Sequence, residues 1–219
     1  MSNWRRRLLI DFIFDPVCPW CYIGKRRLEG ALALRPDTEV AIRWRPFLLN
    51  PEMPPEGIDR TAYLIKKFGS EARVSRVYGA INETGQSIEI DFDFEHISHT
   101  PSSVNAHRLV RFAERSGKEA EAVEALFFAY FIEARNIGES EVLAAIGANL
   151  GLDAQEVSAY LAGDDDVARI YQENAGAHRL GINGVPAFVF NDRMAVSGAQ
   201  EPPVLARVID AAQAAERVA

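Results

Sequence analysis

The chain has 219 residues, of which 48% are hydrophobic, and its formal net charge at pH 7 is −7. That length and apolar content suffice for a sizeable core, either as one large domain or as one domain with an insertion. The acidic balance argues against a general nucleic-acid binder, and no apolar stretch is long enough to span a membrane, so we expect neither as a partner.

The N-terminus carries three arginines at residues 5–7, followed by apolar residues 8–10, which superficially resembles an export signal. Asp11 and Asp15 interrupt the apolar run, and no small-residue cleavage site precedes the first cysteine. We therefore expect a cytoplasmic protein. In that compartment a disulfide is more often transient and catalytic than structural.

The first two predicted elements are a strand and a helix. Residues 8–14 are dense in apolar and aromatic side chains and end at Asp15-Pro16, which predicts a buried strand. Residues 22–34 place apolar side chains among basic and acidic ones at helical spacing, which predicts an amphipathic helix. Pro19 suits the first helical position, where the missing N–H of proline costs nothing.

Cys18 and Cys21 lie at this junction, separated by Pro19 and Trp20, and the chain has no other cysteine. Cys18 is expected at the helix N-terminus, where unpaired backbone N–H groups and the helix dipole favour a thiolate. Cys21 lies on the same side of the helix and can close a disulfide with Cys18. This placement predicts a redox-active pair.

Two other interpretations of the cysteines are weaker. A purely structural disulfide across so short a loop would constrain the unfolded chain little. A structural zinc site usually needs four ligands, and only His96 and His99 offer a second pair. Their separation from the cysteines is far longer than in ordinary zinc modules, so we expect no metal.

A second strand follows the helix. Residues 38–44 alternate partly between polar and apolar side chains, as a strand does. Strand, helix and strand form a βαβ unit, and this context makes a Cys-x-x-Cys spacing a thioredoxin-like signal. The proline-rich residues 51–57 then predict a linker that leaves the sheet.

The next part of the chain has helical periodicity. Ser140 and Asp153 are predicted as helix N-caps. Residues 87–95 alternate apolar and acidic side chains, which fits either a short strand or an extended lid, and the sequence does not decide between them. The predicted helices span residues 60–68, 71–82, 102–116, 118–135, 140–150, 154–162 and 165–180.

The sheet pattern returns at residues 184–190 and 193–197, and a final amphipathic helix follows Pro202-Pro203. These elements predict an α/β protein with a thioredoxin-like fold and a large all-helical insertion between its βαβ and ββα parts. Residues 1–55 and 182–219 would form the discontinuous thioredoxin-like domain, and residues 56–181 the helical insertion domain.

Several stretches now make the chain similar to a known family. They are Asp15-Pro16-Val17-Cys18-Pro19-Trp20-Cys21-Tyr22-Ile23-Gly24-Lys25, residues 45–51, Ala106-His107-Arg108-Leu109, Gly184-Val185-Pro186 and residues 196–200. The chain resembles the DsbA-like family of thioredoxin-fold proteins, and in particular the FrnE-type intracellular thiol–disulfide oxidoreductases. The resemblance runs nearly from end to end.

This resemblance implies that Cys18 is the nucleophile, that Cys21 is the resolving thiol, and that Pro186 is a cis-proline packed against the disulfide. A cis bond would expose the N–H and C=O groups of Val185 for pairing with an extended substrate peptide. DsbA itself has a histidine between its cysteines, whereas this chain has Pro19-Trp20. We therefore expect a milder oxidant than DsbA.

The implied substrates are protein or peptide thiols and disulfides, with no cofactor beyond the redox-active disulfide and with glutathione as a candidate co-substrate. The alternative is a glutathione-dependent transferase or isomerase of the kappa-class or 2-hydroxychromene-2-carboxylate isomerase type, which typically has serine at the Cys18 position. Two retained cysteines favour redox chemistry. His107 is expected to be structural rather than a catalytic base, and the electron donor, direction of flux and oligomeric state stay open.

Overall fold

In the computed structural model, residues 7–218 are described, so Arg5 and Arg6 of the basic N-terminal stretch lie outside the described residues. The elements in chain order are β1 (Leu8–Phe14), α1 (Pro19–Ala33), β2 (Val40–Pro46), β3 (Ile58–Asp59), α2 (Arg60–Phe68), α3 (Glu71–Gln86), β4 (His99–Thr100), α4 (Val104–Glu114), α5 (Glu119–Phe131), α6 (Ser140–Asn149), α7 (Ala154–Ala162), α8 (Val167–Arg179), β5 (Ala187–Phe190), β6 (Met194–Ser197) and α9 (Pro202–Val218).

The main sheet has four strands in the order β2-β1-β5-β6. Strand β1 pairs in parallel with β2 and antiparallel with β5, and β5 and β6 form an antiparallel hairpin. The helices α2–α8 are inserted between β2 and β5. The predicted thioredoxin-like α/β fold with a helical insertion is therefore confirmed.

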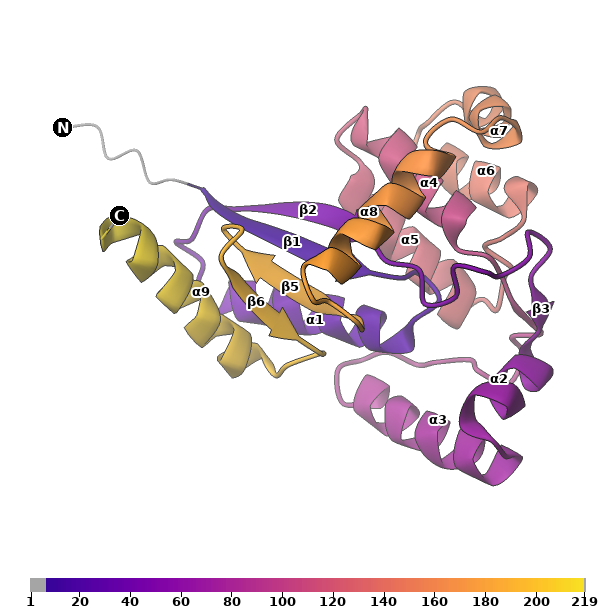
Figure 1. The fold of residues 1–219 in the computed structure, drawn as a ribbon, viewed down its shortest axis with the longest axis horizontal. Coiled ribbons are helices and arrows are strands. Elements are labelled where there is room, and N and C mark those ends of the chain that lie inside the picture. Colours follow the sequence, from indigo (N-terminus) through magenta and orange to yellow (C-terminus); the bar gives the residue numbers. More distant parts are fainter. Residues whose placement is uncertain (1–6, 219) are drawn as a thin grey trace.

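Helices cover both faces of the sheet (Figure 1). Phe12 of β1 belongs to the core that includes α1 and α9, and its ring stacks on Phe188 of β5 with centroids 5.0 Å apart. The next side chain, Ile13, points to the opposite face and packs with Ala177 of α8. Strand β1 is thus buried on both faces, as its apolar sequence predicts.

The inserted helices are those predicted, with shifts at their ends. Helices α2 and α7 have the predicted bounds. Asp153 is confirmed as the N-cap of α7, because its carboxylate accepts hydrogen bonds from the N–H groups of Gln155 and Glu156. The prediction for Ser140 was wrong: Glu139 is the N-cap of α6, and Ser140 is already the first helical residue.

Residues 87–95 form no strand. Helix α3 continues to Gln86, and the chain then runs irregularly with Ile90 and Phe92 buried in the core. Their alternation reflects packing of one side of the segment rather than sheet pairing.

The two-residue ladder of β3 and β4 means that the insertion is not entirely helical. The domain boundaries after residues 55 and 181 stay a prediction.

A buried arginine joins α4 to the end of α7. Arg108 is 1% exposed, and its guanidinium donates to the carbonyl oxygens of Tyr160, Leu161 and Gly163 near the α7 C-terminus. Its other donors reach the carbonyl oxygen of Asp165 and the side chain of Asn105. Arg108 therefore satisfies carbonyl groups that the last turn of a helix leaves without partners.

Buried charges also tie α1 to the insertion. The ammonium group of Lys25, on α1, lies 2.6 Å from a carboxylate oxygen of Glu124 on α5, and it also pairs with Glu29.

Within residues 7–218, no helix combines the length and the apolarity needed to cross a bilayer.

Candidate active site

Cys18 lies where the chain passes from β1 into α1. Its N–H donates to the carbonyl oxygen of Asp15 at 3.0 Å, which closes the turn after the strand. Cys18 is the N-cap of α1 in an extended conformation, and Pro19 follows in the first turn, as predicted. The thiol therefore lies beside the free N–H groups of a helix N-terminus, which favour negative charge.

Cys21 lies one turn further along α1. Cys18 and Cys21 approach within 3.6 Å of each other, and both are free thiols in this structure. Cys21 is 0% exposed, whereas Cys18 is 6% exposed and lines a cavity. Of the two thiols, Cys18 is therefore the one that a partner can reach.

Burial raises the pKa of the Cys21 thiol well above its usual value, with further increases from its hydrogen bond to Cys18 and from the charge of Cys18. The Cys21 thiol therefore stays protonated while Cys18 is reduced. This asymmetry fits the predicted division of roles, in which Cys21 acts second.

The peptide bond between Val185 and Pro186 is cis, which confirms the cis-proline implied by the family resemblance. The Cys18 Sγ lies 3.8 Å from the carbonyl oxygen of Val185 and donates a hydrogen bond to it. A Cβ atom added to Gly24 of α1 would lie 2.8 Å from Pro186 Cγ, so glycine permits this close packing. The cysteines and Val185-Pro186 thus form one site, although they are distant in sequence.

A cavity of about 250 Å³ opens beside Cys18. Trp20 and Val185 line it on the thioredoxin-like side, and Arg60, Tyr63, Lys67 and Tyr78 line it from α2 and α3. The predicted site residues Cys18, Pro19, Trp20 and Val185 therefore share one cavity with side chains of the insertion.

The two histidines that could have completed a zinc site with the cysteines do not line the cavity beside Cys18. The ring of His96 is exposed and bonds to Asp93, and that of His99 contacts Ser98. Between residues 7 and 218, no three His, Cys, Asp or Glu side chains are grouped so that they could hold a metal ion.

Comparison with known proteins agrees with this geometry. The family model for the DSBA-like thioredoxin domain matches residues 9–210, which is nearly the whole chain. The chain belongs to the DSBA-like thioredoxin domain family. The narrower FrnE-type assignment stays a prediction.

Three proteins illustrate what the chain is similar to. The chain is 26% identical over 201 residues to the uncharacterized protein YwbO of Bacillus subtilis (strain 168), covering 89% of this chain and 92% of YwbO. The probable DsbA oxidoreductase SCO1869 from Streptomyces coelicolor matches with a TM-score of 0.85 and 28% identity, covering 94% of this chain and 89% of that one. The cytosolic disulfide reductase DsbM from Pseudomonas aeruginosa, in a structure with GSH, shares the fold with a TM-score of 0.65 and 19% identity, covering 96% and 98% of the two chains.

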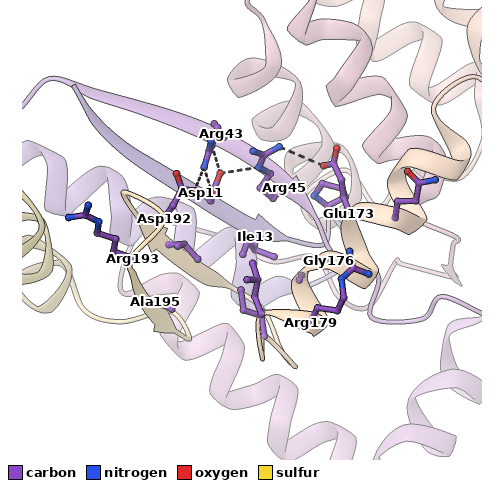
Figure 2. A pocket seen from close by; sticks show the side chains of 16 residues that line it. Asp11, Ile13, Arg43, Arg45, Glu173, Gly176, Arg179, Asp192, Arg193 and Ala195 are labelled. Atoms are coloured by element: carbon purple, nitrogen blue, oxygen red, sulfur yellow. Dashed lines mark hydrogen bonds and ion pairs between the residues drawn. The ribbon is translucent and has the colours of Figure 1, made fainter. Parts of the chain in front are cut away.

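A larger cavity of about 730 Å³ lies between α8 and the sheet of this DSBA-like protein (Figure 2). Several of its charged side chains pair with one another: Asp11 lies 2.5 Å from Arg43 and 3.0 Å from Arg45, and Arg43 also pairs with Asp192. Neither cysteine lines this cavity. We therefore place the candidate active site in the smaller cavity.

Asp15 is a buried carboxyl group near the cysteines, and its place in the sequence did not predict a role in the site. Burial raises the pKa of Asp15 to about 6. The N–H groups of Leu49 and Val17, which donate to its oxygens at 2.8 and 3.2 Å, lower the pKa and offset part of this increase. In the sequence, a carboxylate lies between a buried strand and a reactive cysteine, and this signal could have identified Asp15 as part of the site. Arg60 and Lys67 carry no comparable local signal.

His107 is buried against β1, with its ring 5.0 Å from that of Phe14 and its Nε2 3.3 Å from the carbonyl oxygen of Phe47. Burial lowers its pKa from 6.5 to about 3. It lies outside the cavity of the cysteines, in keeping with the predicted structural role.

Asp15 and His107 give opposite pH dependences of stability. Between pH 3.8 and about 6, Asp15 is protonated in the folded protein and ionised in the unfolded one, so its contribution to stability falls as the pH rises. Between about pH 3 and 6.5, His107 is neutral in the folded protein and protonated in the unfolded one, so its contribution to stability falls as the pH falls. Because the two slopes oppose each other, we expect little net dependence from this pair between pH 4.5 and 5.5.

An Asp15→Asn variant should expose the His107 contribution. Its free energy of unfolding should fall by about 1.4 kcal/mol per pH unit on acidification, relative to wild type. A His107→Gln variant should show a relative slope of the opposite sign. Urea denaturation at pH 4.5, 5.0 and 5.5 measures both slopes; identical slopes in the three proteins would contradict the expectation.

Proposed function

We propose that this DSBA-like protein is a thiol–disulfide oxidoreductase in which Cys18 is the nucleophile and Cys21 the resolving thiol. The observation that carries the proposal is the placement of two free thiols 3.6 Å apart at a helix N-terminus, with the Val185 carbonyl beside the accessible one. Membership of the family supports oxidoreductase chemistry.

The reaction proceeds by two exchanges. In the first, the Cys18 thiolate attacks a disulfide RSSR, so that a Cys18–SR bond forms and RS⁻ leaves. In the second, Cys21 attacks the Cys18 sulfur, its proton is lost, and the second RS group leaves as a thiol. The protein is oxidised by two electrons to the Cys18–Cys21 disulfide, and RSSR is reduced to two thiols. The same steps in reverse oxidise a dithiol substrate.

Pro19, Trp20, Val185 and Pro186 form the environment of this exchange. We assign the backbone of Val185, which lines the cavity beside Cys18, to pair with an extended segment of a protein or peptide partner. Glutathione is proposed as a co-substrate and the cytoplasm as the location; the description of DsbM as a cytosolic reductase with GSH supports both, through the fold alone. No cofactor beyond the cysteine pair is needed for these steps.

The transferase or isomerase alternative requires one group at position 18 that activates or binds glutathione. It gives no role to a second thiol in contact with the first. The proximity of Cys18 and Cys21 therefore favours disulfide exchange.

Trapping of the mixed disulfide tests the proposal. In a Cys21→Ser variant, the helix N-terminus and Cys18 remain, but only an outside thiol can release a partner from Cys18. We expect adducts of proteins or glutathione with Cys18 to accumulate in cells, and to be identified by mass spectrometry under non-reducing conditions.

The matched control is the double variant Cys18→Ser, Cys21→Ser. If Cys21→Ser captures no more adduct than this control, Cys18 does not exchange disulfides in the cell and the assignment is wrong. Conjugation or isomerisation activity that persists or increases in a Cys18→Ser single variant would favour the alternative.

A further inference from the structure

The cavity beside Cys18 contains a buried cation with an unused donor. Arg60 is 5% exposed, and its guanidinium lies 5.2 Å from the ring centroid of Tyr78 and 5.8 Å from those of Phe94 and Tyr130. Its Nη1 donates to the hydroxyl of Tyr130 at 2.9 Å. Its Nη2 is buried, and no group in the described part of the chain accepts a hydrogen bond from it.

Lys67 brings a second cation to the same cavity. Its Nζ donates to the hydroxyl of Tyr63 at 2.9 Å, and it interacts electrostatically with Cys18. Within residues 7–218, neither Lys67 nor Arg60 forms an ion pair with a carboxylate. Asp15 interacts with Lys67 through its charge, but its two oxygens already accept from Val17 and Leu49.

Other buried cations of the protein are satisfied. Lys25 pairs with Glu29 and Glu124, and Arg108 uses all its donors on carbonyl and amide oxygens. Arg60 has three aromatic rings around its charge and, unlike Lys25 and Arg108, one buried donor left over. A buried charge without a partner is costly, and a carboxylate that reached it would make a strong, charge-assisted hydrogen bond.

No carboxylate lines the cavity, so its charge is complementary to an anion. Its volume of about 250 Å³ is slightly below the usual range for ligand pockets, which suits one small group rather than a bulky segment. Cys18 lies in the same wall, so a group bound there is held next to the reacting sulfur.

We propose that Arg60 and Lys67 form a carboxylate-binding subsite, so that the partner of Cys18 is a low-molecular-weight disulfide or thiol carrying a carboxylate. This inference rests on the proposed disulfide exchange and narrows its substrate class. Attack of Cys18 on such a disulfide forms the Cys18–SR bond with the carboxylate of R near Arg60, and the other half leaves as RS⁻. Binding of the carboxylate positions the disulfide for attack.

The test compares oxidation of the reduced protein by two small disulfides. Dithiodiglycolate carries two carboxylates, and hydroxyethyl disulfide is neutral. The readout is the ratio of their second-order rate constants, measured by mass spectrometry of quenched samples. Because intrinsic reactivities of the two disulfides cancel between variants, a change in the ratio reports the subsite.

In Arg60→Gln and in Lys67→Gln we expect the ratio to fall about tenfold relative to wild type, the effect of losing one charge-assisted contact. Arg60→Lys should recover part of it. Lys66→Gln is the matched control: it removes the same charge from the neighbouring residue of α2, which does not line the cavity, and its ratio should stay within about twofold. Lys67 is exposed, so its variant keeps the test usable if Arg60→Gln does not fold.

A ratio that is the same in wild type, Lys67→Gln and every folded Arg60 variant overturns the subsite, while exchange with hydroxyethyl disulfide leaves the proposed function standing. Failure of wild type to react with either disulfide overturns the proposed function, and the subsite with it. Equal losses in Lys66→Gln and Lys67→Gln would show only a general effect of surface charge, which also contradicts a built site.

Discussion

A Cys18→Ser variant is expected to exchange disulfides at least about 1,000-fold more slowly than wild type. The serine hydroxyl keeps the position at the N-terminus of α1 and beside Val185, but it is a poor nucleophile at neutral pH without an adjacent base. The remaining thiol, Cys21, is fully buried and its pKa is raised, so it cannot take over the first step. The rate constant with hydroxyethyl disulfide measures the loss.

The matched variant is Cys21→Ser. It should retain the first step, with formation of the mixed disulfide within about tenfold of the wild-type rate, and lose only its resolution. The two variants therefore separate attack from resolution in a single-turnover experiment. Comparable first-step rates in Cys18→Ser and Cys21→Ser would show that the assigned order of the cysteines is wrong.

An Arg108→Leu variant is expected to lower the free energy of unfolding by about 4 kcal/mol. Leucine fills part of the volume, but the carbonyl groups of Tyr160 and Leu161 lose their donor in a buried place, and that of Gly163 loses its donor in a partly buried one. Each unsatisfied carbonyl carries a desolvation cost, and the end of α7 loses its connection to α4. Urea denaturation at neutral pH measures the change.

Arg115→Leu is the control for this substitution. Arg108 and Arg115 both lie over the ring of Tyr160, at 4.8 and 5.0 Å from its centroid. The side chain of Arg115, however, is 56% exposed, and its ion pair with Asp166 spans 3.8 Å. Such an exposed pair contributes at most about 1 kcal/mol. Equal losses in Arg108→Leu and Arg115→Leu would mean that stacking on Tyr160, and not the buried hydrogen bonds, accounts for the effect.

Local sequence signals predicted the parts of the site that local chemistry determines. An apolar strand, a turn at Asp15-Pro16 and a proline in the first helical turn suffice to place Cys18 at a helix N-terminus. The cis bond before Pro186 followed from family resemblance, since an isolated Gly-Val-Pro sequence does not specify it. The exposure difference between Cys18 and Cys21 needed the structure.

Features that depend on distant contacts had no local signal. Arg60 reaches the cavity because α2 packs against α3, which in turn packs against α1. Its aromatic enclosure includes residues from three separate segments. In the sequence, Arg108 belongs to a stretch that resembles a family motif, and this stretch does not indicate what its guanidinium binds. The structure shows that it binds carbonyl groups at the end of α7. The period of two in residues 87–95 fitted a strand, but no neighbouring strand is in place to pair with it.

The pairing of β1 has a consequence for the order in which the protein is made. Strand β1 joins β2 early in synthesis, but Ile10 of β1 pairs with Phe190 of β5, so that edge stays uncovered until almost the whole chain has left the ribosome. The inserted helices contact mainly one another and can form in the meantime. Throughout this interval the nascent chain already carries Cys18 and Cys21 but lacks Val185, so both thiols are present before the cavity beside Cys18 is complete.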